Sequence, residues 1–476
     1  MKVAYGEWKP DVGGPNSGVA TTADGVLPQA SATGLGYGPA AALVTATGAE
    51  ALSGEPKGMI SALKADGSYA VIAATETTIE MMDSSYQWSD IETGRTGVGE
   101  LDTSFAQFGK YVLNTNTVDG FKAYDVDAGG ANSAVSGAPA ARQVFVTNNL
   151  VVACGISTNN RRMQSSAIGD HTNWTTQGAD GVTFPDGGAL IGGRDMKSGA
   201  AVLFQENAIR LMQFSGAGAT LYTITKVADG RGAVSDRAIV AFDGMCFFVA
   251  TDGIYKLTLG GGLEPIGAEK VNRWLAGQVS ASDYSKIVAA VDPFQKVVWF
   301  QLPNIGKLLG YDWQLNVFFT ATVSSTYLSR IATPGISIDS VSDAIDDVDL
   351  AIDSRLWSGG GLLFGALDSA YKFATFSGAA LEATLQTCDT ALPQSAMVNW
   401  CTPDSDASGS LVYLGVSDNR HTAMTWKSAA TKATSGRVGL RGRGKMFALK
   451  EVIPAGSDWT FANGMDDIEF SAGGLR

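Results

Sequence analysis

The chain has 476 residues, of which 45% are hydrophobic and only 17% are charged. This balance excludes an intrinsically disordered protein, because disordered chains are poor in apolar residues and rich in charge. With 34 Lys and Arg against 47 Asp and Glu, the formal net charge is -13, which argues against a protein that grips nucleic acid by its phosphates.

The cysteines and the N-terminus indicate where the protein is made. Its four cysteines are spread over the chain without a C-x-x-C pair, so we expect reduced thiols and assembly in a cytoplasm. Residues 1–11 lack the apolar core of a secretory signal, and no apolar run is long enough to span a membrane. We therefore expect a soluble protein with no membrane span.

Residues 1–40 are rich in Gly and Pro and carry few large apolar side chains. Such a segment does not bury enough surface to fold alone. We expect an extended N-terminal arm that becomes ordered by lying on a neighbouring subunit.

From residue 41 to residue 380, short apolar or alternating runs are separated by turn dipeptides, which is the pattern of β-hairpins. The clearest case is a three-strand meander over 238–242, 246–250 and 254–259. Its turns are Asp243-Gly244 and Asp252-Gly253. Further pairs are predicted for 60–64 with 69–73, 144–146 with 150–153, 287–291 with 297–302, 308–312 with 317–321, and 362–366 with 371–376.

These hairpins recur with the spacing of propeller blades, about 40 to 45 residues per four-stranded unit. We predict a mostly β fold: a β-propeller-like ring of six to eight antiparallel four-stranded blades over 41–380, with the extended N-terminal arm before it. Residues 381–476 form a C-terminal β region with large anchors at Trp400, Trp426 and Trp459, either as a separate domain or as a unit that completes the ring. Two packed β-sandwiches are the alternative.

One segment departs from the alternation of strands. Ile338, Ile345 and Ile352 recur every seven residues, and each is followed by Asp. This spacing favours a short helix or an ordered connection with an acidic face. A calcium loop over 339–353 is the alternative, although the segment lacks the Gly and the closing Glu of a hand-type loop.

The sequence offers little material for catalysis. His171 and His421 are the only histidines, and neither an H-E-x-x-H nor a G-x-S-x-G motif is present. Residues 439–446 nearly match a phosphate-binding loop, but Met446 stands where a Ser or Thr must bind magnesium, and Gly34-x-Gly36-x-Gly38 is a weaker match still. We therefore expect that the protein is not an enzyme and that it binds neither a cofactor nor a metal ion.

A basic cluster stands out near the end of this acidic chain. It consists of Arg437, Arg441, Arg443, Lys445 and Lys450. One interpretation is a solvated strand face. The other is a surface that docks onto an acidic neighbouring subunit.

Four stretches, in the same order along the chain, resemble the tail nozzle (hub) family of short-tailed bacteriophages. The first is S-S-A-I-G-D-H-T-N-W at 165–174, and the second is L-F-Q-E-N-A-I-R-L-M at 203–212. The strongest runs from 232 to 275 and includes F-F-V-A-T-D-G-I-Y at 247–255. The last covers 436–459 and the closing G-G-L-R at 473–476.

The resemblance implies a structural virion protein of the phage tail, assembled in the host cytoplasm as a six-fold homo-oligomeric ring. Such a ring lies below the portal and adaptor rings, extends the DNA channel, helps to retain the packaged genome and supports tailspikes or tail fibres. Double-stranded DNA would pass through it without tight binding, and no catalytic motif comes with the family. The alternatives are a carbohydrate-binding or adhesin-like propeller, and a polysaccharide-degrading tail enzyme with paired carboxylates.

Overall fold

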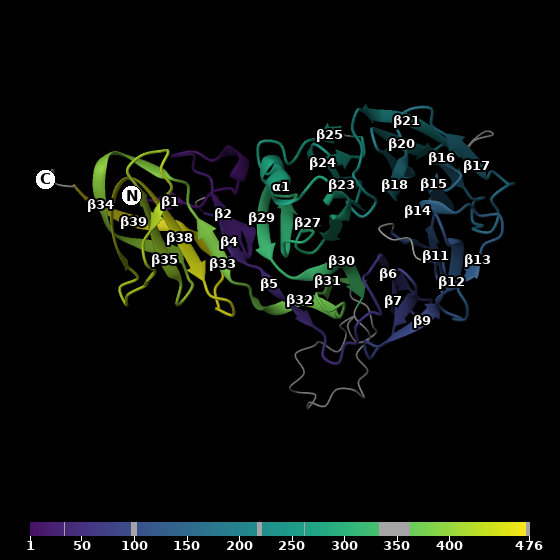
Figure 1. Ribbon diagram of the computed structural model, residues 1–476, viewed down its shortest axis with the longest axis horizontal. Helices are drawn as coiled ribbons and strands as arrows, with labels where there is room; N and C mark the ends of the chain where they lie inside the picture. The colour runs from purple at the N-terminus through teal and green to yellow at the C-terminus, as the bar shows by residue number, and fades with distance from the viewer. Residues whose placement is uncertain (33, 97–101, 217–220, 261, 333–361, 473–476) are drawn as a thin grey trace.

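The computed structural model describes residues 1–32, 34–96, 102–216, 221–260, 262–332 and 362–472. The molecule is elongated, with a propeller towards one end and a C-terminal β region at the other (Figure 1). Strands dominate, so the prediction of a mostly β fold is confirmed. Helical structure among the described residues is limited to α1 (Asn272–Gln278) and the 3-10 turns η1 (Pro10–Val12) and η2 (Tyr284–Lys286).

The propeller consists of four-stranded antiparallel blades, as the hairpin spacing predicted. The described residues form seven blades. Six of them are separate four-stranded sheets, and the remaining one, blade 6, continues into the C-terminal sheet. Blade 1 is β6 (Gly58–Leu63), β7 (Tyr69–Ala74), β8 (Ile79–Met82) and β9 (Trp88–Glu92). Blade 2 is β10 (Ser104–Phe108), β11 (Tyr111–Asn116), β12 (Gly120–Asp125) and β13 (Ser133–Ala134). Blade 3 is β14 (Ala141–Thr147), β15 (Leu150–Ile156), β16 (Asn159–Ser165) and β17 (Asp180–Thr183).

The other blades follow in chain order. Blade 4 is β18 (Leu190–Asp195), β19 (Ala200–Gln205), β20 (Ala208–Phe214) and β21 (Tyr222–Asp229). Blade 5 is β22 (Ile239–Phe242), β23 (Met245–Ala250), β24 (Gly253–Thr258) and β25 (Leu263–Glu264). Blade 6 is β26 (Val288–Asp292), β27 (Val297–Leu302), β28 (Lys307–Asp312) and β29 (Val317–Thr322). Blade 7 is β30 (Ser325–Ala332), β31 (Leu362–Asp368), β32 (Phe373–Ala380) and, from the start of the chain, β5 (Ala41–Thr45).

The first strand of each blade contacts the first strand of the next, and β30 contacts β6, so the ring is closed. Blade 7 makes this closure with strands from both ends of the propeller sequence. β5 pairs antiparallel with β32, with Leu43 opposite Phe376 and Thr45 opposite Ala374. Thr45 Oγ1 also donates a 2.6 Å hydrogen bond to Asp368. The two ends of the ring are thus joined by a strand ladder.

Two of the predicted hairpins have turns with two successive residues of positive φ. Asn148 and Asn149 between β14 and β15 have φ values of 47° and 58°, and Asp243 and Gly244 between β22 and β23 have φ values of 50° and 77°. Two successive residues with positive φ match the right-handed twist of the flanking strands. This is why Asn, Asp and Gly at these positions marked the hairpins correctly.

The C-terminal β region is one large sheet that incorporates the start of the chain. Its strand order runs from blade 6 through β2, β33, β38, β34, β39 and β4 to β3. β2 makes the junction, because it pairs with β29 of blade 6 on one side and with β33 on the other. The strands from the C-terminal part of the chain are β33 (Ala383–Gln386), β34 (Thr390–Ser405), β35 (Leu411–Ser417), β36 (Thr425–Trp426), β37 (Ala430–Thr431), β38 (Val438–Ile453) and β39 (Ala462–Ala472). The N-terminal strands are β1 (Val3–Ala4), β2 (Thr22–Asp24), β3 (Val26–Ser31) and β4 (Gly34–Pro39).

The N-terminal segment 1–40 corrects one expectation. It forms strands on the C-terminal β region of its own chain, with Val3 opposite Met465 in the β1–β39 pair, so a neighbouring subunit is not needed to order it. Tyr5, Trp8 and Tyr37 are buried there. These three aromatic side chains supply the burial that the average composition of the segment concealed.

Two sequence predictions concern other parts of the chain. The Asp-rich segment 339–353, with its helix and calcium-loop interpretations, lies outside the described residues. Within the described ranges, no helix is long and apolar enough to cross a membrane.

Candidate functional site

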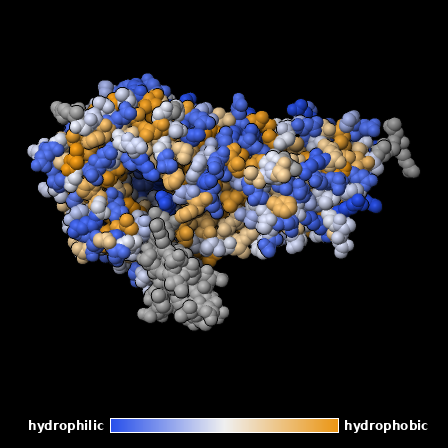
Figure 2. All heavy atoms as spheres, turned by 180° about the vertical axis from the view of Figure 1, so that it is seen from behind, coloured by the Kyte–Doolittle hydropathy of each residue, from blue (hydrophilic) through white to orange (hydrophobic). Residues whose placement is uncertain are grey.

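A polar cavity of about 480 Å³ lies at the centre of the propeller, where the first strands of the blades converge. Figure 2 shows a hollow at this place with hydrophilic residues in its wall. Its volume is within the range of sites that bind small molecules. The charged residues that line it are Asp102, Arg194, Asp236, Arg237 and Arg330.

One ion pair crosses from blade 2 to blade 5 in this cavity. Arg237, just before β22, pairs with Asp102, just before β10; its Nε donates a 2.6 Å hydrogen bond to Asp102 Oδ2, and its Nη2 donates to Oδ1. Burial lowers the pKa of Arg237. A two-point contact of this kind fixes the orientation of both planar groups.

A second arginine of the cavity, Arg194, is held by hydrogen bonds from all three of its guanidinium nitrogens. Arg194 Nη1 donates a 2.6 Å hydrogen bond to Asp236 Oδ1, Nη2 donates to the Asp236 carbonyl at 2.8 Å, and Nε donates to the Ile239 carbonyl at 3.2 Å. Burial alone would lower the pKa of Arg194, but the adjacent Asp236 carboxylate outweighs it and raises the pKa. This ion pair ties blade 4 to its neighbour, blade 5.

One polar atom of the described cavity lining lacks a partner. Arg330 Nε, on β30, is buried and forms no hydrogen bond to a described residue. The two carboxylates, in contrast, are each bound by an arginine, so the described lining does not supply the free pair of carboxyl groups that glycoside hydrolysis requires. The arrangement favours holding a small polar or anionic group over acid–base chemistry.

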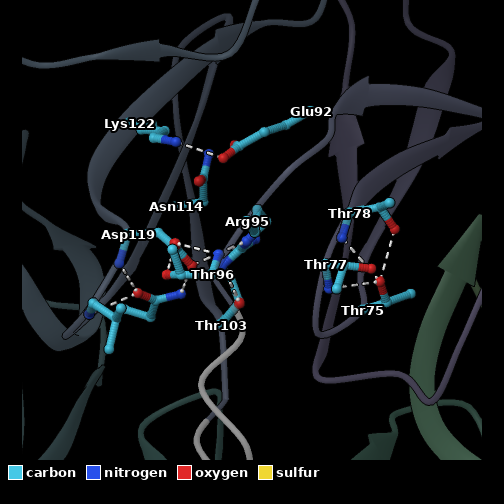
Figure 3. A network of polar contacts seen from close by, with 12 residues as sticks. Thr75, Thr77, Thr78, Glu92, Arg95, Thr96, Thr103, Asn114, Asp119 and Lys122 are labelled. Carbon is cyan, nitrogen blue, oxygen red and sulfur yellow. Dashed lines mark hydrogen bonds and ion pairs between the residues drawn. The ribbon is translucent and has the colours of Figure 1, made fainter.

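A polar network lies between blades 1 and 2 (Figure 3). Arg95 Nη2 donates a 2.9 Å hydrogen bond to Thr103 Oγ1, and its Nε lies 3.3 Å from Asp119 Oδ2. Burial would raise the pKa of Asp119, but hydrogen bonds from Asn116 and Thr96, together with Arg95, lower it to about 2. Arg95, Thr96 and Thr103 lie in the connection from blade 1 to blade 2, and Asp119 lies in the turn between β11 and β12. The network therefore fixes this connection to blade 2.

The two histidines lie outside the central cavity. His171 packs against the rings of Phe108 and Tyr111, with centroid distances of 5.7 Å and 4.5 Å, and burial lowers its pKa. His421 is exposed in the connection after β35. Among the described residues, no group of three His, Cys, Asp or Glu side chains is arranged to hold a metal ion.

The near-match to a phosphate-binding loop is part of a strand. Residues 439–446 lie within β38, and no helix follows them in the described chain. Gly34, Gly36 and Gly38 likewise lie in β4, which pairs with β3. Neither segment forms the loop and helix N-terminus that bind phosphate.

Four of the five residues of the predicted basic cluster lie on one strand, β38, and Arg437 directly precedes it. Arg441, Arg443 and Lys445 alternate with buried residues along β38, and all three side chains are exposed; we call these three residues the basic ridge. Alternation is expected because successive side chains of a strand point to opposite faces. Arg443 Nε donates a 3.3 Å hydrogen bond to Ser395 Oγ.

The other two members of the cluster rest on aromatic rings. Arg437 lies 3.9 Å from the ring centroid of Trp400, and Lys450 lies 4.5 Å from Tyr413 and 4.9 Å from Trp426. No ion pair joins any of the five cluster residues to another described residue. The acidic Glu469 of β39 is on the ridge face, opposite Trp400 in the strand pairing.

Sequence reasoning found the basic cluster but missed the central cavity. The pattern R-G-R-G-K shows alternation directly. Asp102 and Arg237 are 135 positions apart, and no spacing rule connects them. The only local signal is that Asp102 and Arg237 each lie just before the first strand of a blade.

The comparisons with known proteins assign no family to this chain. No protein-family model and no curated protein sequence matches the chain. Among solved structures, the chain is similar to the β-propeller domain of Cps50 (Swd1) from Myceliophteria thermophila, with 10% identity, a TM-score of 0.41, and coverage of 58% of this chain and 90% of that one. It is also similar to a streptogramin B lyase, with 11% identity, a TM-score of 0.42, and coverage of 70% and 96%.

Proposed function

We propose that this chain is a structural, non-enzymatic subunit of a short-tailed bacteriophage virion and forms the tail nozzle ring below the portal and adaptor. The observation that carries the proposal is the basic ridge. It presents three exposed cations, without an acidic partner among the described residues, on a chain whose net charge is -13. The four stretches that resemble the nozzle family support the same interpretation.

The charge distribution suits a subunit of a larger assembly. The segment 381–476 carries nine Lys or Arg against ten Asp or Glu, so almost all of the net negative charge of the chain lies in the segment 1–380. Oppositely charged surfaces steer association and fix its register. A chain with a nearly neutral end that bears a basic strand, and an acidic remainder, is suited to contact further copies of itself.

The net negative charge of the chain also suits a conduit for DNA. Each lysine or arginine that contacts a phosphate adds salt-dependent affinity, whereas an acidic or neutral wall lets the duplex slide. In the proposed function the ring extends the channel, helps to retain the packaged genome and carries tailspikes or fibres on its outside.

A carbohydrate-binding or adhesin-like tail propeller is the second candidate. The polar cavity of about 480 Å³ at the propeller centre favours it. Binding of an oligosaccharide on a glycan array, lost on Arg330→Ala, would support this candidate.

Three measurements test the nozzle proposal: the assembly state of the chain, its binding of DNA, and the DNA content of particles that lack it. Mass photometry and negative-stain electron microscopy of the purified chain should show a closed ring, and the ring should bind duplex DNA only weakly at physiological salt. Particles assembled without the protein should package DNA into their heads but then lose it. A chain that stays monomeric at all concentrations and binds glycans would instead favour the adhesin.

A further inference from the structure

The outermost strand of blade 1 carries an acidic surface. β9 pairs with β8 on one side, and no described strand covers its other edge. Asp90 lies on β9, Asp83 in the turn between β8 and β9, and Glu50 beside Trp88 of β9. All three are exposed, and we call these three residues the acidic edge. The segment 50–92 carries eight Asp or Glu against two Lys, so this blade is rich in negative charge.

The acidic edge is held in place by backbone contacts. Asp83 Oδ1 accepts hydrogen bonds from the Ser85 and Gln87 N–H groups at 2.8 Å and 2.9 Å. Glu50 Oε2 accepts from the Trp88 N–H of β9 at 3.3 Å. No ion pair links Glu50, Asp83 or Asp90 to another described residue. The carboxylates of Asp83 and Glu50 are therefore positioned, and none of the three is neutralised by an ion pair to a described residue.

The acidic edge and the basic ridge match in number and are opposite in charge. Each has three exposed charged side chains and no ion pair to the described part of its own chain. β38 lies in the C-terminal β region and β9 on the far side of the propeller (Figure 1). Because the two surfaces belong to opposite parts of an elongated molecule, one copy cannot bring its own ridge to its own edge.

We propose that the basic ridge of one copy docks onto the acidic edge of blade 1 of a second copy. This inference rests on the proposed function, since it names the contact between neighbouring ring subunits. A contact between two different surfaces is heterologous, and it propagates until the rotation closes a ring. Each subunit then uses its ridge once and its edge once.

Charge reversal on the two surfaces tests the contact. The ridge variant is R441E/R443E/K445E, the edge variant is E50K/D83K/D90K, and the combined variant carries all six changes. A matched control, R161E/R420E/K427E, changes the net charge by the same amount as the ridge variant at exposed positions elsewhere. The thermal midpoint of each variant separates a loss of folding from a loss of contact. This check matters most for the edge variant, because Asp83 and Glu50 also accept backbone hydrogen bonds.

The expected results differ between the variants. Mass photometry should show the apparent dissociation constant of the assembly raised by about 100-fold or more for the ridge and edge variants, because like charges then face each other. The combined variant should assemble again, since the reversed surfaces are complementary. The control should assemble as the wild type does.

Other outcomes overturn the inference. Wild-type assembly by the ridge variant, or a combined variant as weak as the ridge variant, would show that the two surfaces do not meet. Intact assembly with loss of duplex DNA binding in the ridge variant would make the ridge a nucleic-acid surface. In each of these cases the wild-type ring still forms and the proposed function stands, whereas a wild type that never assembles contradicts both.

Discussion

The Tyr5 hydroxyl donates a 2.6 Å hydrogen bond to Glu451 Oε2, and both side chains are fully buried. The other carboxylate oxygen, Oε1, accepts a 2.8 Å hydrogen bond from Ser405 Oγ. Burying a carboxylate is costly unless it is hydrogen-bonded, so the hydrogen bonds from these two hydroxyls lower the free-energy cost of burying Glu451 in β38. The contact also fixes the start of the chain to the strand that bears the basic ridge.

Removing this hydroxyl should destabilise the C-terminal β region. We expect Tyr5→Phe to lower the free energy of unfolding by about 1–3 kcal/mol, because Glu451 loses a donor that no water replaces. Urea unfolding measures the change. Tyr284→Phe is the control, since that hydroxyl is half-buried and makes no hydrogen bond to a described residue. Equal stabilities for the two variants would contradict the expectation.

Buried tyrosines and thiols should make the protein sensitive to alkali. Burial raises the pKa of Tyr222 and of Tyr255 to about 12, and it raises the pKa of Cys246 and of Cys401 to about 12. All four groups are neutral in both states below about pH 7.5. At higher pH the unfolded chain ionises them first, its thiols around pH 8.5 and its tyrosines around pH 10, while the folded groups stay neutral until near pH 12, so stability is lost as the pH rises.

The thermal midpoint should therefore change little from about pH 7 to 7.5 and fall steadily above about pH 8. Differential scanning calorimetry across this range measures it. Cys246→Ala should lower the midpoint at every pH but make its decline above pH 9 shallower. A midpoint that rises, or stays level, up to pH 11 would show that burial does not hold these groups neutral.

Much of the fold could be predicted because its signals are local. The turn at Asp243-Gly244 and the apolar runs on either side of it are enough to define β22 and β23. The closure of the ring could not be predicted in the same way, because β5 and β32 lie at opposite ends of the propeller sequence and their pairing depends on the finished ring. Composition was misleading for the N-terminal segment 1–40, where a few aromatic side chains outweigh many glycines.

The two parts of the candidate site, the basic ridge and the central cavity, differ in how well the sequence predicts them. The basic ridge was visible because charged and small residues alternate over a short stretch of one strand. The central cavity depends on the first strands of the blades, which meet at one axis, so its residues come from distant parts of the propeller sequence. No pattern within a single strand carries that information.

The meander of blade 5 should depend on two adjacent phenylalanines. Phe248 packs on Phe204 of blade 4, with a centroid distance of 4.7 Å, and Phe247 faces Tyr311 of blade 6 at 6.0 Å. Both are fully buried. We expect Phe247→Ala and Phe248→Ala each to cost about 3–5 kcal/mol, which is a large share of the stability of a domain.

The matched surface change in this blade is Lys256→Ala. Lys256 pairs with the exposed Glu264 at 2.9 Å, and exposed pairs contribute at most about 1 kcal/mol. Chemical unfolding followed by tryptophan fluorescence compares the three variants. If both phenylalanine variants unfold at the wild-type denaturant concentration, blade 5 does not pack between its neighbours as described.

The Arg237–Asp102 pair provides the sharpest test of the central cavity. The side chains are 12% and 23% exposed, so each charge relies on the other more than on water. Asp102→Ala leaves the guanidinium without its carboxylate, and breaking a buried pair costs about 3–5 kcal/mol, with the lower end expected for a cavity that admits some solvent. Arg237→Met leaves the more exposed carboxylate and should cost less.

The double variant Asp102→Ala/Arg237→Met removes both charges, so no unpaired ion from this pair remains in the cavity. Its loss of stability should therefore be smaller than the sum of the two single losses by at least about 1 kcal/mol, which a double-mutant cycle in urea measures. The matched cycle on Arg237 and Glu264 should show no coupling, because these residues do not form an ion pair. Additive losses for Asp102 and Arg237 would mean that solvent screens both groups, and the cavity would then be an open channel without a bond between blades 2 and 5.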